Sequence, residues 1–377
     1  MKTKILTFFV AIVAVALAAN AQSTTMHQTY QAGNPAFTPP SHSVVWAAIV
    51  FESPDEFYGT EEAVRMAENV LLFQRDVGGW QKNTDMSVVL SESDKEKLIA
   101  NKSNSDDVTF DNEATFMEMQ YLAKVYNKTG DERFKQAFLK GLNYIFEAQY
   151  EIGGWPQVYP NLMSTNYTAR ITYNDGVTIN ALTILKKIVE RDEMYAFVDD
   201  PALIERSREA LNRGIDVVLK TQIRQNGVLT GWCGQHCEIT LEPRPARLWE
   251  LVSICGLESA GIAMFLMSFE NPTPEMRQAI DAVVEWYERV KITGFRLENL
   301  VGENGRPDRR LVEDPNAPPL WARFYDLETN IPFFAAHRDG IKVSTFEELA
   351  QGSRAGYHFY VHSPQEMLDM YKEYVKK

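Results

Sequence analysis

Apolar residues recur every three or four positions over most of the chain, which is the period of an amphipathic α-helix. The pattern begins near Val44, and its first strong stripe passes through Ala63, Met66, Val70 and Phe73. Similar stripes predict helices over residues 116–126, 134–145, 177–188, 203–219, 257–267 and 280–290. The sequence therefore predicts a helical domain that starts near residue 44.

A Gly-Trp pair follows successive helical units. Trp80, Trp155 and Trp232 lie 75 and 77 residues apart, and Gln74 and Gln149 each precede a tryptophan by six residues. A repeated helical hairpin cannot bury its apolar faces alone, so neighbouring units must stack on it. We therefore expect an all-α fold in which about three helical hairpins close into an incomplete α/α barrel, or α/α toroid. Its long loops, with the three tryptophans, would meet on one rim.

The C-terminal part has a different pattern. Residues 299–320 are rich in glycine, proline and charge, which predicts a long loop folded over the rim. Helices that start at Thr345 and Ser363 are expected to close the ring.

The N-terminus predicts export. Two early lysines precede an apolar run over residues 5–18, and Ala19-Asn20-Ala21 is a small-x-small cleavage site. This is the pattern of a secretory signal peptide. We expect a signal peptide over residues 1–21, a linker over 22–43 and one catalytic domain over 44–377, exported to the periplasm or the medium.

Charge and cysteine content narrow the class of partner. The formal net charge is −13, so the overall field does not attract nucleic acid or an anionic membrane. We expect a monomer that binds neither. Three cysteines leave two states open, one disulfide plus a free thiol or three free thiols.

Three charged residues are expected to occupy the same place in their repeats, each before one of three successive helical stripes. Asp111, Asp175 and Arg247 are 64 and 72 residues apart, so a shared rim would bring them together. Two carboxylates from separate loops suit calcium. The simpler interpretation is that the aspartates cap helices and that Arg247 pairs with Glu250, three positions later.

Aromatic and basic residues accompany these positions. A tryptophan after glycine either plugs a helix end or offers a sugar ring a surface for stacking. Lys82, Arg323 and Arg338 are each typical of solvated charges, but together they would offset the acidic field at one place. Planar arginine also matches a carboxylate well.

The ordered motifs resemble a known family. They are Gly78-Gly79-Trp80-Gln81-Lys82-Asn83, Asp111-Asn112-Glu113-Ala114-Thr115, Gly153-Gly154-Trp155-Pro156-Gln157, Tyr173-Asn174-Asp175, Gln235-His236, Pro245-Ala246-Arg247 and Trp321-Ala322-Arg323. In this order, between Trp46 and Tyr360, they resemble the family 10 polysaccharide lyases, which are pectate lyases.

The resemblance implies calcium-assisted β-elimination that cleaves α-1,4-linked polygalacturonate to unsaturated oligogalacturonides. It implies Arg247 as the base that removes the C5 proton, and Asp111 and Asp175 as ligands of Ca²⁺. The residues that it implies for substrate binding are Lys82, Asn112, Trp155, His236, Arg323, Arg338 and Tyr360. Because arginine holds its proton strongly, an alkaline optimum is expected.

The sequence departs from the family pattern at Cys237, at Leu248-Trp249 and at His337. These changes flank the implied base, so they bear on subsite specificity and activity. Two other functions stay open. A glycoside hydrolase would use Asp111 and Asp175 as its two carboxylates. A non-catalytic oligogalacturonide-binding protein would keep the aromatic and basic rim without turnover.

Overall fold

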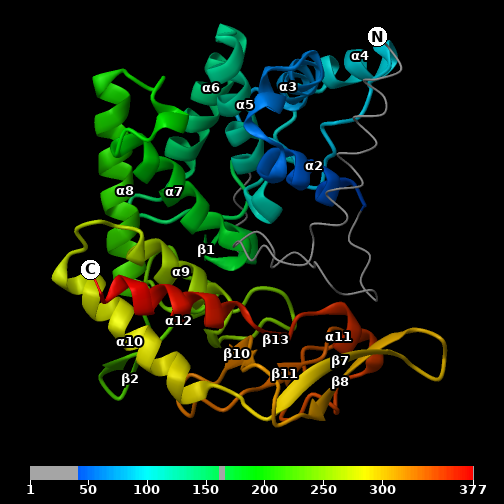
Figure 1. Ribbon diagram of the computed structural model, residues 1–377, viewed down its shortest axis with the longest axis vertical. Helices are drawn as coiled ribbons and strands as arrows, with labels where there is room; N and C mark the ends of the chain where they lie inside the picture. The colour runs from blue at the N-terminus through cyan, green and yellow to red at the C-terminus, as the bar shows by residue number, and fades with distance from the viewer. Residues whose placement is uncertain (1–40, 161–165, 377) are drawn as a thin grey trace.

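The computed structural model describes residues 41–160 and 166–376 (Figure 1). The predicted signal peptide and nearly all of the predicted linker lie outside these residues, so they stay predictions. The described chain is helical from Ser41, slightly before the predicted start. None of its described helices is both long enough and apolar enough to span a bilayer.

Helices form the larger part of the molecule, and they cover every stripe that periodicity predicted before residue 291. Each begins at a side-chain cap or a proline where the sequence supplies one; Thr60, Asp131, Asp200 and Thr273 accept from the first free N–H groups. The α-helices are α2 (Ser41–Glu52), α3 (Glu61–Phe73), α4 (Glu92–Ala100), α5 (Phe116–Thr129), α6 (Glu132–Ala148), α7 (Val177–Val189), α8 (Pro201–Thr221), α9 (Glu258–Met267), α10 (Pro274–Val290), α11 (Gln351–Gly356) and α12 (Ser363–Tyr374).

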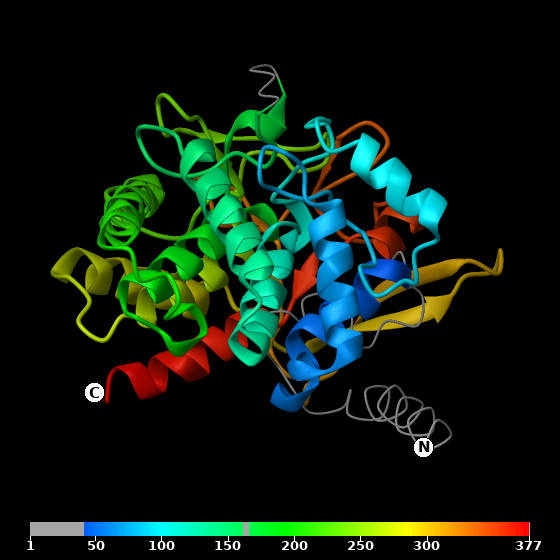
Figure 2. The same ribbon diagram turned by 90° about the horizontal axis from the view of Figure 1, so that it is seen from above.

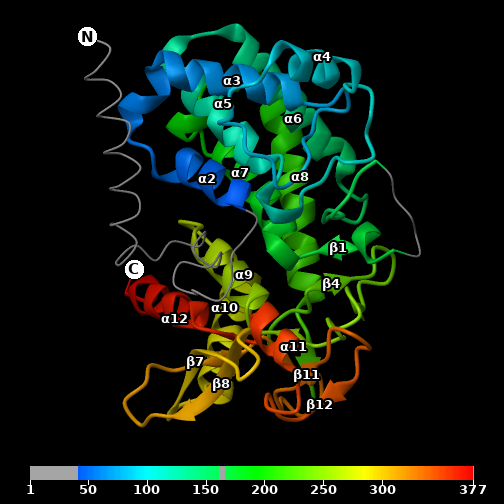
Figure 3. The same cartoon turned by 90° about the vertical axis from the view of Figure 1, so that its right-hand side faces the viewer.

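The strands are mostly two residues long and pair into small antiparallel sheets, ordered β1-β4-β5, β10-β6, β11-β12, β13-β9, β2-β3 and β7-β8. Figure 3 shows β1, β4, β11 and β12 along one side of the molecule. The strands are β1 (Ile171–Thr172), β2 (Arg224–Gln225), β3 (Val228–Leu229), β4 (Gln235–His236), β5 (Pro243–Arg244), β6 (Ile254–Cys255), β7 (Phe295–Val301), β8 (Pro307–Glu313), β9 (Trp321–Ala322), β10 (Phe324–Tyr325), β11 (Phe334–Ala335), β12 (Lys342–Val343) and β13 (Tyr360–Val361).

The prediction of an all-α toroid is wrong. The residues that the structure describes are about 48% helical and 13% strand, and the strands form several antiparallel sheets. The segment expected to be a long loop contains most of the β7-β8 hairpin, which extends away from the body in Figures 1 and 2. Two-residue strands are too short to show an alternating pattern. Charged residues interrupt the apolar pattern of the hairpin, so periodicity could not reveal these strands.

One main core joins the helical and β parts. Its buried residues run from Trp46 to Leu368 and come from every helix except α4 and α11. Consecutive helices pack in pairs, α5 with α6, α7 with α8, and α9 with α10. The C-terminal helix α12 packs against α9 and α10, as Figure 1 shows. This packing gives the site loops a rigid support.

Buried tryptophans repeat at the ends of four helices. The indole N–H of Trp80 donates to the carbonyl of Val70 (2.8 Å), and that of Trp155 to Ile145 (2.7 Å). Trp232 and Trp321 make the same bond, at 2.7 and 2.9 Å, to carbonyls in α8 and α10. All four side chains are 0% exposed. The tryptophans therefore tie these helices to the segments that follow them.

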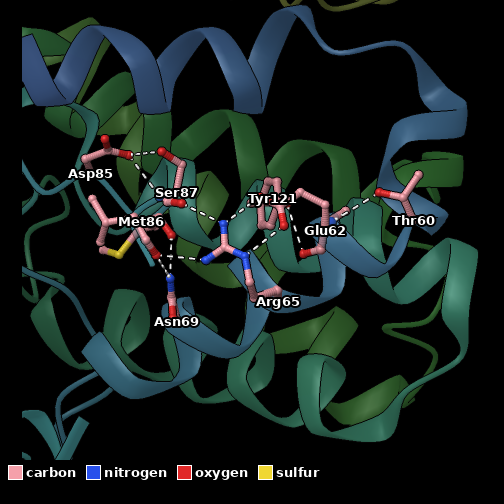
Figure 4. A network of polar contacts seen from close by, with 10 residues as sticks. Thr60, Glu62, Arg65, Asn69, Asp85, Met86, Ser87 and Tyr121 are labelled. Atoms are coloured by element: carbon pink, nitrogen blue, oxygen red, sulfur yellow. Dashed lines mark hydrogen bonds and ion pairs between the residues drawn. The ribbon is translucent and has the colours of Figure 1, made fainter. Parts of the chain in front are cut away.

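A polar network holds the loop after Lys82 against α3 (Figure 4). Arg65 donates to the carbonyls of Ser87 (2.7 Å) and Val88 (2.8 Å), and Asn69 donates to that of Met86 (2.9 Å). Glu62 fixes Arg65 by an ion pair of 2.6 Å. Residues 86–88 are thereby tied to a helix, which limits the freedom of the segment that carries Lys82.

Candidate active site

Two short 3₁₀ turns place the predicted carboxylates side by side. Asp111 begins the turn Asp111–Glu113, and Asp175 lies in the turn Asn174–Gly176; the two turns contact each other. Asn112 and Asp175 both have φ of 52°, a left-handed conformation that Asn and Asp tolerate best among residues with a side chain. The two turns therefore have the same backbone conformation. Asp175 corresponds in this conformation to Asn112, which is one position after Asp111.

Each turn is fixed by hydrogen bonds of its backbone to neighbouring loops. The backbone N–H of Asp111 donates to the Thr109 hydroxyl (3.0 Å), which donates in turn to the carbonyl of Gln157 (2.7 Å). The N–H of Asn174 donates to the carbonyl of Gly234 (3.1 Å). A Cβ on Gly234 would lie 2.2 Å from the Asn174 amide oxygen, so any larger residue there would displace the Asn174 side chain.

The carboxylates lie in contrasting surroundings. Asp111 is nearly buried and forms an ion pair with Lys82, whose side chain is 45% exposed. Burial, and next the charge and hydrogen bond of Asp111, raise the pKa of Asp175 to about 8. The Arg323 and Arg247 guanidiniums oppose this rise without cancelling it. Two acids this close cannot both ionise easily unless a cation joins them.

This coupling predicts how stability depends on pH in the calcium-free protein. Folded Asp175 keeps its proton up to about pH 8, whereas the unfolded chain releases it near its ordinary value of 3.8. Between these values the folded state binds more protons, so its contribution to the free energy of unfolding falls as pH rises. Urea unfolding in chelator should show Asp175→Asn losing less stability than the wild type from about pH 5 to about pH 8. An equal loss of stability in the wild type and in Asp175→Asn would contradict the raised pKa of Asp175.

Arg247 lies in a loop and is fixed by Glu250. Its Nε and Nη2 donate to the two carboxylate oxygens of Glu250, at 2.8 and 2.6 Å. The Tyr357 hydroxyl donates to the same carboxylate (2.6 Å). Burial lowers the pKa of Arg247, but Glu250 outweighs it and holds this pKa above the ordinary value. The simpler interpretation, an Arg247–Glu250 pair, is thus confirmed as a contact, with 39% of the Arg247 side chain still exposed.

Arg247 does not occupy the same repeat position as the aspartates, so that expectation is wrong. The N–H groups of Trp80, Trp155 and Trp232 bond the hydroxyls of Thr115, Thr178 and Ser259, which aligns the three units. Arg247 lies twelve residues before Ser259, whereas Asp111 and Asp175 lie four and three residues before their threonines. It nevertheless reaches the same site, because it interacts electrostatically with Asp175.

Arg323 belongs to the buried wall of the site. Its Nη2 donates to Glu258 (2.6 Å), and the two side chains are only 8% and 3% exposed. Its guanidinium also lies over the Tyr357 ring, 4.8 Å from the centroid. The interpretation of Arg323 as a direct ligand of a substrate carboxylate is therefore not supported by this geometry, since Glu258 holds that group.

Residues that depart from the family pattern pack beside Arg247. The Arg247 guanidinium lies 5.3 Å from the Trp249 ring, and His337 packs on that ring at 4.4 Å. Gly340 packs closely against the backbone carbonyl of Leu248, the residue before Trp249. Arg338, between His337 and Gly340, is exposed. The structure thus brings Arg338 to the neighbourhood of the implied base.

Two predicted substrate-binding residues have no exposed surface. Trp155 and His236 are 0% exposed, and His236 uses Nδ1 to contact the carbonyl of Leu241 (2.9 Å). These two interpretations are wrong, because aromatic type and loop position do not reveal burial. Tyr360 contacts the rings of Phe334 (5.5 Å) and Phe346 (5.3 Å) but is partly exposed, so its role stays a prediction. Of the others, Asn112 is partly exposed beside Asp111 and donates to the Asn83 amide oxygen (2.9 Å).

A conservative change at Trp155 separates packing from sugar binding. Trp155→Phe removes the indole hydrogen bond and part of a fully buried ring, so the free energy of unfolding should fall by about 1–3 kcal/mol. The KM for polygalacturonate should stay within about twofold of the wild type, because Trp155 has no exposed surface. Denaturant unfolding and initial rates would measure both. A large rise in KM at unchanged stability would restore the stacking interpretation.

Some site residues were not found from the sequence. Glu258 lies 65 positions from its partner Arg323, so no local pattern connects them. Tyr167, in the 3₁₀ turn Tyr167–Ala169, interacts electrostatically with Arg247, Asp111, Glu250 and Lys82. Its place in the loop between Trp155 and Asp175 was the one signal that could have identified it.

The residues present could hold a calcium ion through two carboxylates. Among the described residues no group of three or more His, Cys, Asp and Glu side chains is arranged for a metal. Asp111 and Asp175 are instead a close acid pair with a raised Asp175 pKa, which a divalent cation would relieve. Calcium accepts amide oxygens, water and substrate oxygens as its further ligands. The site therefore suits a weakly held ion completed by an anionic substrate.

Comparison with known proteins agrees with this geometry. The family model for pectic acid lyase matches residues 74–368. The family 10 polysaccharide lyase from Cellvibrio cellulosa is 28% identical, with a TM-score of 0.72, and the match covers 91% of this chain and 99% of that one. An aspartate mutant of that enzyme in complex with trigalacturonic acid is 29% identical, with a TM-score of 0.73 over 93% and 99% of the chains. Comparison with curated proteins gave no match. The chain belongs to the pectic acid lyase family and is a pectate lyase.

Proposed function

We propose that this lyase cleaves α-1,4-linked polygalacturonate by calcium-assisted β-elimination and releases unsaturated oligogalacturonides. The observation that carries the proposal is the meeting of Asp111, Asp175 and Arg247 at one site, from three separate loops. The complex of the Cellvibrio lyase with trigalacturonic acid supports an acidic polysaccharide as the substrate class.

Arg247 is the proposed base. Glu250 accepts from Nε and Nη2, and among the described residues Nη1 has no such partner, so Nη1 is the nitrogen left for the substrate. In the reaction Arg247 takes the C5 proton, the C4–O bond breaks, and a double bond forms between C4 and C5. The leaving oxygen receives a proton from water. Glu250 and Tyr357 keep the guanidinium in place during this transfer.

The proton at C5 is weakly acidic because the neighbouring carboxylate already carries a negative charge. Calcium held by Asp111 and Asp175 would neutralise the charge that develops on this carboxylate. Lys82 and Arg338 are the exposed cations available to other uronates, and Asn112 offers an amide beside Asp111. Since Glu250 raises the pKa of Arg247, we expect the rate to increase with pH into the alkaline range.

The direct test is a rate assay of residues 22–377 on polygalacturonate, with calcium and with chelator. β-Elimination conjugates the new double bond with the carboxylate, so ultraviolet absorbance should rise with calcium and stop in chelator. No rise at any pH, with the protein folded, would reject the elimination. A rise that chelator leaves unchanged would reject the calcium requirement.

A second proposal concerns location. The N-terminal pattern at residues 1–21 supports export to the periplasm or medium, and a polymeric substrate that cannot enter the cytoplasm is consistent with it. N-terminal sequencing of the protein from fractionated cells should find Gln22 as the first residue. Recovery of the uncleaved chain in the cytoplasm would contradict export.

A further inference from the structure

A short segment bridges the two halves of the site. The N–H groups of Gln157 and Val158 both donate to the carbonyl of Thr168, at 2.9 and 3.2 Å. Gln157 in turn accepts from the N–H of Phe110 (2.9 Å), the residue before Asp111. One end of the segment 166–170 is therefore tied to the loop that carries the acid pair.

The other end of the segment is tied to the loop of the base. The Arg170 guanidinium donates to the carbonyl of Pro245, two residues before Arg247. Asn166 accepts from the N–H of Thr168 (3.2 Å) and fixes the 3₁₀ turn that starts at Tyr167. Tyr167 is thus held from both sides by contacts that do not involve its own side chain.

The Tyr167 side chain lies near the charged groups of the site. It is partly exposed, and it interacts electrostatically with Arg247 and Glu250 as well as with Asp111 and Lys82. It is therefore near both the proposed base and the proposed calcium side. We expect a uronate chain that reaches both to pass near this ring.

We propose that Tyr167 is a substrate-positioning residue, whose ring packs on a galacturonate and whose hydroxyl donates a hydrogen bond to that sugar. This inference rests on the proposed function, because it takes the chain to lie across Asp111, Asp175 and Arg247. A tyrosine suits the position, since its ring matches the apolar face of a pyranose and its hydroxyl matches the polar edge.

The surroundings keep this hydroxyl a donor under working conditions. Burial raises the pKa of Tyr167 above its ordinary value of 10, and the positive charge of Arg247 opposes this rise without cancelling it. An ordinary phenol would begin to ionise in alkaline solution and would then repel an anionic sugar. The protonated phenol at this site continues to donate.

The test is binding of trigalacturonate in calcium, measured by calorimetry on the inactive Arg247→Ala variant. Adding Tyr167→Ala should raise the dissociation constant about tenfold. Adding Tyr167→Phe, which disturbs packing less, should raise it about threefold. The matched control is Tyr374→Ala, at the end of α12, which should leave binding unchanged. Unchanged binding in both Tyr167 variants, or an equal loss in the control, would overturn the proposal.

Kinetics in the otherwise wild-type enzyme separate positioning from folding. Tyr167→Phe should raise KM about threefold and leave kcat nearly unchanged, with the same urea midpoint as the wild type. A lowered midpoint with unchanged KM would show a structural role only and would overturn the proposal. Because the binding arm needs no turnover, a wild type that binds trigalacturonate but fails the absorbance assay would reject the elimination while still testing Tyr167.

Discussion

Replacement of Arg247 by alanine is expected to lower kcat on polygalacturonate about a thousandfold, with a much smaller change in KM. The guanidinium is partly exposed at the site, and Glu250 and Tyr357 fix it from behind. A residue that accepts the proton during the reaction stabilises mainly the transition state, so its loss should lower kcat. Initial rates of absorbance at saturating calcium would measure this effect.

Folding must be controlled separately, because Arg247→Ala leaves a buried carboxylate without its partner. The Glu250 side chain is 4% exposed, and such a loss destabilises proteins by about 3–5 kcal/mol. The double variant Arg247→Ala, Glu250→Gln removes that charge and should recover stability while it stays inactive. Arg208→Ala, which breaks an exposed pair on α8, is the matched control and should keep full activity. A folded Arg247→Ala enzyme with near wild-type kcat would exclude Arg247 as the base.

Asp175→Asn is expected to abolish the response to calcium and to reduce kcat/KM at least a hundredfold. The substitution removes one of the two carboxylates that meet at the site, while its amide keeps the shape and tolerates the left-handed turn. In the wild type, calcium should raise the midpoint of thermal unfolding, and more so above about pH 8 than below it, since Asp175 must lose its proton to bind.

The calcium-dependent shift should vanish in Asp175→Asn and in Asp111→Asn. Asp216→Asn, at an exposed ion pair on α8, is the matched control and should show the wild-type shift. If Asp175→Asn kept both the thermal shift and the activation by calcium, the ion would have to bind elsewhere on the chain.

The helical part of the fold could be predicted because apolar period and helix caps are local. The stripe from Phe116 and the turn at Gly130-Asp131 mark α5, α6 and their junction. The β part could not be predicted in this way. The pairing of Phe324 with Cys255 joins residues far apart in the chain, and a two-residue strand leaves no periodic trace. The fourth tryptophan, Trp321, was obscured by the β7-β8 hairpin that precedes it.

The site could be predicted where function requires charged residues within a motif. Asp111, Asp175, Arg247 and Lys82 meet because loops after successive helices share one side of the molecule. Prediction failed for Trp155, because residue type indicates what a side chain can do but not whether substrate can reach it. Contacts such as Arg323–Glu258 depend on the complete fold.

The central claim is elimination, and the masses of the products test it most directly. Complete digestion of trigalacturonate with calcium should give fragments whose masses add up to that of the substrate, with one fragment carrying the C4–C5 double bond at its new non-reducing end. A hydrolase that used Asp111 and Asp175 as acid and base would add one water to each cleavage. Fragments that together weigh one water more than trigalacturonate, with no unsaturated product, would contradict the account.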